Sequence, residues 1–368
     1  MAAPLETIRV IDLSRILAGP WATQLLGDYG ADIIKVERPG AGDDTRQWGP
    51  PWFDESNDRQ SAYFLATNRN KRSITVDLAT GQGQELIRDL VGRADVLPEN
   101  FKVGTLDRFG LSYQELRKVN PRLVYCSISA FGQTSSRAVE PGYDAMIQAS
   151  AGLMSITGAA DEEGGSPQKV GVAIADIMAG MYASTAVLAA LNARERTGEG
   201  QFIDVPLYDS QVAWLANQNL NYLIGGKAPA RMGTAHPNLV PYQAFATADG
   251  NLMLAVGNDR QFADCARCIG AVHLADDPRF ARNSARIENR AALVELLQTE
   301  FRKRPTGDWL DELRHCNVPA GPINDIQEVL DNAYAKERQL VRYVDDSMAQ
   351  PIPTVANPVD FSQTPVRY

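Results

Sequence analysis

Histidine and cysteine are scarce in this chain, with three histidines and four cysteines among 368 residues. No two histidines have the spacing of metal ligands, so we expect no histidine-based metal site. Cys265 and Cys268 form a lone C-x-x-C motif inside a predicted helix, without a second pair to complete a metal site. We interpret them as thiols packed in or near a core. Reduced thiols are typical of a cytoplasmic protein.

Three motifs that mark common nucleotide and ester chemistry are missing. The first strand-to-helix turn, residues 13–20, lacks G-x-G-x-x-G, and Gly40-Ala41-Gly42 lacks the third glycine. This disfavours a nicotinamide dehydrogenase. No G-x-x-x-x-G-K-[ST] occurs, which disfavours a P-loop nucleotide hydrolase. No G-x-S-x-G occurs either, which disfavours a serine hydrolase.

The sequence also lacks an excess of positive charge. Its 36 Lys and Arg residues against 45 Asp and Glu residues give a net charge of −9, so nucleic acid is not an expected partner. The N-terminus carries no secretory signal. The longest apolar stretch, residues 177–191, is interrupted by Gly180 and Ser184. We therefore expect a buried helix rather than a membrane span, in a cytoplasmic protein that does not bind membranes.

What the first 225 residues do contain is an alternation of strand-like and helix-like segments. Such alternation predicts parallel strands joined by helical crossovers, and hence a doubly wound, Rossmann-like α/β domain. The expected strands cover residues 8–12, 31–37, 73–77, 94–97, 123–128 and 201–207. The first expected helix begins near Gly19, and the later ones cover residues 81–93, 112–119, 177–196 and 208–223.

The texture changes after residue 225. Two short strand-like runs flank Asp249-Gly250, which is a hairpin signal, and three helical segments follow. We predict a large α/β domain over residues 1–225 and a smaller α+β domain over 226–325. The rest of the chain, 326–368, reads as a helix to residue 340 followed by an extended, Pro-rich tail.

Asp176 is the carboxylate with the most informative surroundings. It lies between an apolar, strand-like run (residues 169–175) and a long apolar helix. One interpretation is a helix N-cap, whose side-chain oxygen accepts from free backbone N–H groups. The other is a nucleophile at the edge of a sheet, where open α/β folds keep their chemistry. The spacing alone leaves both open.

Cations and one aromatic residue lie near the ends of predicted strands. Arg38 ends the second strand, Lys71 precedes the third, and Asn100-Phe101 follows the fourth. Crevices at strand ends bind ligands in α/β sheets, where Phe101 could stack on a base and cations could hold phosphates. The alternative for each is an ordinary solvated surface residue.

These residues resemble the family III CoA-transferases (the CaiB/BaiF type), from about residue 5 to residue 360. The similar segments are residues 17–20, 30–40, 70–73, 99–101, 106–108, 141–144, 176–180 and 196–201. The resemblance implies an interlocked homodimer, with a large domain completed by 326–368. Members of the family usually continue past the equivalent of Tyr368, and the sequence does not tell whether this chain is truncated at its C-terminus.

The resemblance also assigns roles. Asp176 would be the catalytic aspartate. The residues along coenzyme A would be Ile16, Arg38, Lys71, Asn100, Phe101, Arg108 and Tyr143. The carboxylate substrate would meet Arg46, Asp144 and His236. Coenzyme A and its acyl esters would be substrates, with no tightly bound cofactor and no metal.

Two departures from the family pattern refine this expectation. Related α-methylacyl-CoA racemases use a histidine as a base where this chain has Tyr143, which disfavours a racemase. A glycine-rich loop of formyl-CoA transferase is replaced by residues 233–243, which include His236. That segment is similar to the branch that handles succinate and other short dicarboxylates.

The resemblance implies transfer of CoA from an acyl-CoA, with succinyl-CoA the favoured donor, to a short carboxylate. Asp176 would form a mixed anhydride and then an aspartyl-CoA thioester, which splits one difficult step into two. Its position at a helix start would keep it ionised. A racemase-like enzyme and a non-catalytic CoA-ester-binding protein remain the alternatives. Donor, acceptor and pathway are not readable from the sequence.

Overall fold

The structure is a computed structural model that describes residues 3–53, 60–345 and 350–368. Its contacts divide the chain into two compact units. The first comprises Met1–Met154, Lys169–Pro229 and Ala333–Tyr368, and the second comprises Ser155–Gln168 and Ala230–Asn332. The predicted divisions at 225 and 325 fall a few residues before these bounds. The short segment 155–168, which the sequence placed in the large domain, belongs to the second unit.

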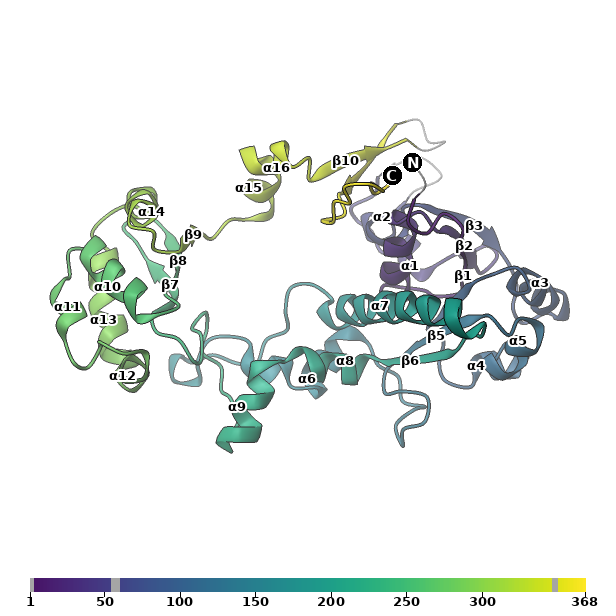
Figure 1. The fold of residues 1–368 in the computed structure, drawn as a ribbon, viewed down its shortest axis with the longest axis horizontal. Helices are drawn as coiled ribbons and strands as arrows, with labels where there is room; N and C mark the ends of the chain where they lie inside the picture. Colours follow the sequence, from purple (N-terminus) through teal and green to yellow (C-terminus); the bar gives the residue numbers. More distant parts are fainter. Residues whose placement is uncertain (1–2, 54–59, 346–349) are drawn as a thin grey trace. The chain divides into compact units, whose positions relative to one another are not determined.

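The first unit is built on a six-stranded sheet in the order β3-β2-β1-β4-β5-β6, with every neighbouring pair parallel (Figure 1). This is the strand order of Rossmann folds, and it confirms the predicted parallel α/β sheet. The strands are β1 (Arg9–Asp12), β2 (Asp32–Glu37), β3 (Lys71–Thr75), β4 (Val96–Glu99), β5 (Val124–Ser129) and β6 (Phe202–Pro206).

Both faces of this sheet are apolar and covered. Successive strand residues point to opposite faces, so Val10 and Val96 belong to one buried cluster while Ile11 and Leu97 belong to another. The first cluster includes residues of α1 (Ala18–Asp28) and α7 (Ile174–Thr197), and the second includes residues of α3 (Gly81–Val91) and α5 (Tyr113–Val119). The sheet is therefore wound on both sides, as a Rossmann-like domain requires.

Helix α7 has the length and composition of a membrane span. One face of it, including Ala179, Ala183 and Val187, is buried in the core beside the sheet. Figure 1 shows it running along β5 and β6. It packs as a core helix, and it begins three residues before the predicted start.

Two predicted helices are each interrupted. Residues 208–223 form α8 (Leu207–Trp214) and α9 (Asn217–Gly225), separated at Ala216, whose φ is 47°. Residues 326–340 form α15 (Ile326–Asp331) and α16 (Ala333–Glu337), separated by extended Asn332. Part of the tail predicted as simply extended forms an antiparallel hairpin, β10 (Val341–Val344) with β11 (Ile352–Val355).

The remaining short helices of the first unit lie in connections. They are α2 (Ala62–Asn68), α4 (Thr105–Arg108), α6 (Asp144–Ser150), and the 3-10 turns η1 (Asp44–Gln47) and η2 (Leu153–Ile156), the last of which ends in the second unit.

The second unit has its own sheet and its own core. Strands β7 (Tyr242–Ala246) and β8 (Asn251–Ala255) form the predicted hairpin, and β9 (Ala320–Pro322), which the sequence did not predict, pairs with β8. The core includes Phe245, Phe262 and Phe301. Its described helices and turns include α15 and also η3 (Asp161–Glu163), α10 (Asp259–Cys268), α11 (His273–Asp276), α12 (Asn283–Glu288), α13 (Arg290–Phe301) and α14 (Thr306–His315).

Candidate active site

The loop between β1 and α1 is fastened on several sides. Asn100, which follows β4, accepts from the N–H of Arg15 (2.8 Å) and donates to its carbonyl (2.7 Å). The Ser14 carbonyl accepts from the Lys35 ammonium at 2.9 Å, and Asp43 accepts from the N–H of Ile16 at 3.3 Å. These bonds hold Ile16 at φ 70°, a conformation that is unfavourable for a β-branched residue. Strain of this kind persists only where the surroundings over-determine it.

Buried ion pairs lie beneath this loop. The Lys35 ammonium lies 2.8 Å from the Asp43 carboxylate, and both side chains are at most 1% exposed. The Lys71 ammonium lies 3.3 Å from the Asp12 carboxylate. Burial by itself would raise the pKa of Asp12 and Asp43, but the neighbouring lysines lower both below the ordinary value. Each buried carboxylate therefore has a buried ammonium as its partner. Lys35 and Asp43 also bond to the backbone of the loop and so hold it in place.

A cavity of about 250 Å³ opens at the carboxyl ends of β1 and β4. The strand order of the sheet reverses between these two strands, and α/β folds bind ligands at such a point. The lining includes the fastened loop, the segment after β4, and Asp176. In full it comprises residues 15–18, 44, 100–103, 128–130, 138, 140–143, 176 and 207.

Asp176 lies in the first turn of α7, and it is not the helix cap. The N-cap position is Ala173, which has no capping side chain. The carboxylate that caps this end belongs to Asp144 on α6, which accepts from the N–H of Ala175 at 2.8 Å. The segment before α7 is also not a strand. The cap interpretation of Asp176 was therefore wrong, because a residue distant in sequence supplies the cap and leaves Asp176 free to face the cavity.

The charge state of Asp176 is set by its surroundings. Burial, together with a smaller contribution from the nearby negative charge of Asp144, raises its pKa to about 7. The expectation that the helix start keeps Asp176 ionised neglected this desolvation. A carboxyl group that titrates near neutrality in a cavity is typical of a functional site.

A glycine determines how closely α7 approaches α1. Gly180 lies one turn after Asp176, and a Cβ atom there would come within 2.6 Å of the Ala18 carbonyl oxygen. The close approach brings Asp176 and the start of α1, at Leu17 and Ala18, to the same cavity. No side chain caps the start of α1. Free amides at a helix start favour negative charge, such as that of an oxyanion formed during a reaction.

Four of the residues predicted to bind coenzyme A line this cavity together with Asp176. They are Ile16, Asn100, Phe101 and Tyr143. The Arg15 guanidinium lies 5.4 Å from the centre of the Phe101 ring. Tyr143 is 68% exposed, so its ring is available at the rim.

The three predicted cations lie elsewhere. Arg38 has a 64% exposed side chain and lies 3.7 Å from Asp44, a cavity residue. Arg108 is exposed at the end of α4. Lys71 is buried, and its ammonium donates to Asp12, to the Pro20 carbonyl and to Asn68. A phosphate contact by Lys71 would therefore require exchange of one of these bonds.

The residues predicted to bind the carboxylate belong to different elements of the chain. The Arg46 guanidinium forms two 2.7 Å hydrogen bonds to Glu37 and lines a different cavity, of about 540 Å³, with Lys71. Asp144 caps α7, as described above. His236 belongs to the second unit, where its Nδ1 accepts from the N–H of Asn238 at 3.0 Å.

The structure adds two residues that the sequence did not single out. Arg15 lines the cavity and pairs with Asp44 at 3.0 Å. Arg15 follows β1, and a cation near a strand end is the same sequence signal that marked Arg38 and Lys71. Tyr63, on α2, lies close enough to Asp176 and Asp144 that burial and these charges raise its pKa. No local pattern marks Tyr63, so only the fold could reveal it.

The fold and cavity define a class: a Rossmann-type α/β protein with a carboxylate at the switch point of its sheet. The sequence comparisons make this specific. The model of CoA-transferase family III matches residues 5–368, and the chain belongs to this family of enzymes.

Individual relatives agree with this assignment. The chain is 50% identical to a succinate–glutarate CoA-transferase of Agrobacterium fabrum over 99% of this chain and 91% of the relative. It is 44% identical to a human succinyl-CoA:glutarate CoA-transferase over 89% of this chain and 73% of the relative. The crystal structure of a CaiB/BaiF family protein from Brucella suis matches with a TM-score of 0.86 and 48% identity, covering 100% of this chain and 95% of that one.

Proposed function

We propose that this enzyme transfers CoA from succinyl-CoA to a short dicarboxylate such as glutarate. The observation that carries the proposal is the position of Asp176, which faces the switch-point cavity next to a fastened loop and the uncapped start of α1. Relatives that are named succinate–glutarate and succinyl-CoA:glutarate CoA-transferases support the choice of substrates. A redox cofactor is not needed, since the thioester already carries the activated acyl group.

The proposed chemistry uses Asp176 as a covalent nucleophile. Its carboxylate attacks the thioester carbonyl, which forms an aspartyl–succinyl anhydride and releases the CoA thiolate. The thiolate attacks the aspartyl carbonyl, giving an aspartyl-CoA thioester and free succinate. The acceptor carboxylate then attacks this thioester, which forms an anhydride between the acceptor and Asp176 and releases the CoA thiolate again. The thiolate attacks the acyl carbonyl of the acceptor, which gives the new CoA ester and restores Asp176. Each step moves one acyl group, and no proton is consumed overall.

Trapping tests this intermediate directly. Hydroxylamine added during reaction with succinyl-CoA should mark a peptide that contains Asp176, which peptide mass spectrometry can locate. A mark at another carboxylate, or none in an active enzyme, would contradict the assignment of the nucleophile.

Coenzyme A is proposed to lie along the cavity rim. Phe101 and Tyr143 offer faces for stacking, and Arg38 and Arg108 are exposed cations that could meet phosphates. Such contacts act in both the ground and transition states, so Arg38→Ala and Arg108→Ala should raise the KM for succinyl-CoA more than they lower kcat. Exposed Arg260, in the second unit, is a control. An unchanged KM for succinyl-CoA in both arginine variants would show that neither arginine contacts the phosphates of coenzyme A.

The acceptor is proposed to be held through its second carboxylate, with His236, Arg46 and Asp144 near the carboxylate substrate. An anion buried without a partner is unfavourable, so loss of the clamp should affect dicarboxylates selectively. Glutarate should exceed butyrate by at least roughly tenfold in kcat/KM, about 1.4 kcal/mol. His236→Ala should narrow that ratio. Equal rates with butyrate in the unaltered enzyme would refute the dicarboxylate preference and leave CoA transfer intact.

A racemase-like activity and non-catalytic binding of CoA esters are the competing functions. Incubation with succinyl-CoA and a panel of carboxylates, analysed by mass spectrometry, separates all three. Transfer yields a new CoA ester, a racemase changes only the stereochemistry of a 2-methylacyl-CoA, and a binding protein leaves every ester unchanged.

An interlocked homodimer is part of the same proposal. Helix α9 exposes apolar side chains that a second chain could cover, namely Leu220, Tyr222, Leu223 and Ile224. Light scattering should therefore give twice the chain mass of 40.2 kDa. A double change of Leu223 and Ile224 to Glu should weaken association, whereas Val139→Glu, at another exposed apolar position, should not. A monomer at micromolar concentration would refute the dimer.

A further inference from the structure

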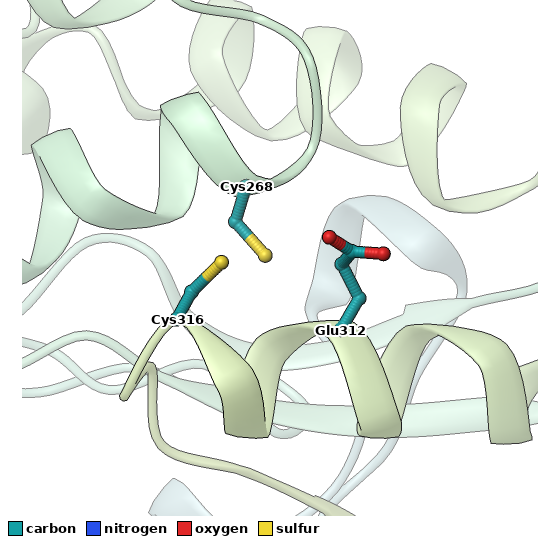
Figure 2. A group of neighbouring side chains, drawn as sticks. All are labelled: Cys268, Glu312 and Cys316. Atoms are coloured by element: carbon teal, nitrogen blue, oxygen red, sulfur yellow. The ribbon is translucent and has the colours of Figure 1, made fainter.

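Two cysteines and one glutamate of the second unit converge at the ends of two helices. Cys268 is the last residue of α10, and Glu312 and Cys316 are one turn apart at the end of α14. Figure 2 shows the two thiols pointing toward each other and the carboxylate beside them. Their donor atoms lie within 4.8 Å of one another. The sequence pairs Cys268 with Cys265, but Cys265 is buried in the core and the tertiary structure gives Cys268 a different neighbour.

The electrostatics at this place favour a cation. Both thiols lie at helix C-termini, where the helix dipole presents its negative end. Reactive redox cysteines need the opposite surroundings, such as a helix N-terminus or a neighbouring cation. The cluster therefore suits a bound cation better than an oxidant-sensitive thiol pair.

We propose that Cys268, Glu312 and Cys316 form a binding site for one zinc ion. Two sulfur donors and one carboxylate oxygen are a donor set for Zn²⁺, whereas Ca²⁺ and Mg²⁺ prefer oxygen donors alone. Three protein ligands leave the fourth tetrahedral position to water. Each cysteine binds as a thiolate, so coordination releases one proton from each thiol. Cys268 and Cys316 both border the core of the unit, so the ion would join α10 to α14 there.

The ligands need little rearrangement to reach the ion. Cys268 and Cys316 are half-buried, and Glu312 is exposed. Glu312 lies 3.5 Å from the Arg304 guanidinium, an exposed pair that contributes little free energy. A carboxylate has two oxygens, so one can bind the ion while the other stays near Arg304. The site depends on the second unit alone and is independent of the proposed transfer reaction.

Cobalt is the probe that tests the site. The full chain, reduced with a phosphine and freed of metal, is titrated with Co²⁺, and sulfur-to-cobalt charge-transfer absorption is followed in the near ultraviolet. We expect saturation at one Co²⁺ per chain and loss of the absorption when Zn²⁺ is added. Cys268→Ser and Cys316→Ser should each weaken Zn²⁺ binding by more than about 100-fold, since even outer partners of metal ligands are worth 10–100-fold. Glu312→Gln should weaken it by roughly tenfold.

Matched variants keep the test decisive. Glu295→Gln removes an exposed carboxylate on α13, and Cys126→Ala removes a buried thiol of the first unit; neither should change the titration. Circular dichroism checks each fold, and Cys316→Ala replaces the serine variant if that variant unfolds. Absence of sulfur-to-cobalt absorption, an unchanged affinity in either cysteine variant, or an unchanged affinity in Glu312→Gln would each overturn the three-residue site.

Discussion

The carboxylates of the first unit occupy two kinds of surroundings. Beneath the loop after β1, Asp43 pairs with Lys35, and Glu37 binds Arg46 with two hydrogen bonds. Burial opposes ionisation there, but the cations prevail, and the pKa of Glu37 falls to about 2. Asp176 and Glu99 are desolvated, no cation among the residues that the structure describes compensates for it, and the pKa of each rises to about 7.

This difference separates positioning from chemistry. A paired carboxylate is permanently charged and can hold a loop in a strained conformation, as Asp43 holds Ile16. Asp176 faces the cavity without a neighbouring cation among the described residues, at the cost of binding a proton near neutral pH. The paired group should therefore govern stability and Asp176 should govern activity, which four experiments can test.

The largest effect is expected at the nucleophile. Asp176→Asn removes the attacking oxygen, so CoA transfer should fall by at least about 10⁴-fold, as for other covalent nucleophiles. The Kd for succinyl-CoA should hardly change, and the free energy of unfolding should not fall, because the variant loses no ion pair and removes a desolvated carboxylate. Steady-state kinetics measure the transfer rate, and urea denaturation measures the free energy of unfolding. Turnover near the parental rate would end the assignment.

The buried pair should control stability. Lys35→Met leaves the Asp43 charge buried and unpaired, so the free energy of unfolding should drop by about 3–5 kcal/mol in urea denaturation. Arg72→Met is the control, because its pair with Asp32 is largely exposed and should be worth about 0–1 kcal/mol. Comparable losses in the two variants would contradict the contrast drawn between buried and exposed pairs.

Glu99 should make stability depend on pH. Its pKa is about 7 in the folded chain and 4.5 as the ordinary value, so the folded state binds the proton more tightly. Its stabilising contribution is complete below pH 4.5 and is lost as the pH rises to 7. Glu99→Gln cannot lose that proton. Between pH 5 and pH 8 the parent should lose on the order of 2 kcal/mol more than the variant. Parallel pH curves would show that Glu99 titrates normally.

The smallest effect is expected from the neighbour of Asp176. In the parent, kcat/KM should rise with pH and level off above about 7, as Asp176 ionises. Asp144→Asn keeps an oxygen for the Ala175 N–H but removes the negative charge. The rise should therefore move to lower pH by about one unit or less. A profile that stays in place would mean that desolvation alone sets the pKa of Asp176.

Local patterns anticipated much of the architecture. Runs of apolar residues located all six parallel strands to within two residues at every bound, and Asp249-Gly250 located the β7–β8 hairpin. They failed where backbone geometry overrides pattern, as at Ala216, where one apolar helix breaks into two. They also missed β9, because a three-residue strand carries too little periodicity to detect.

For the candidate site, the sequence by itself drew attention to Asp176 at the start of a long apolar helix and to the segment after β4, where an aromatic residue at a strand end is a local signal; the family resemblance supplied the catalytic role of Asp176. Only the tertiary structure brought Asn100 to the backbone of Arg15, gave the cap of α7 to Asp144, and set Lys35 against Asp43. It likewise placed the Cys268 thiol beside that of Cys316, a residue distant in sequence. Residue type fixes what a side chain can do, but burial and partners fix its charge state, and those arise only when distant segments pack together.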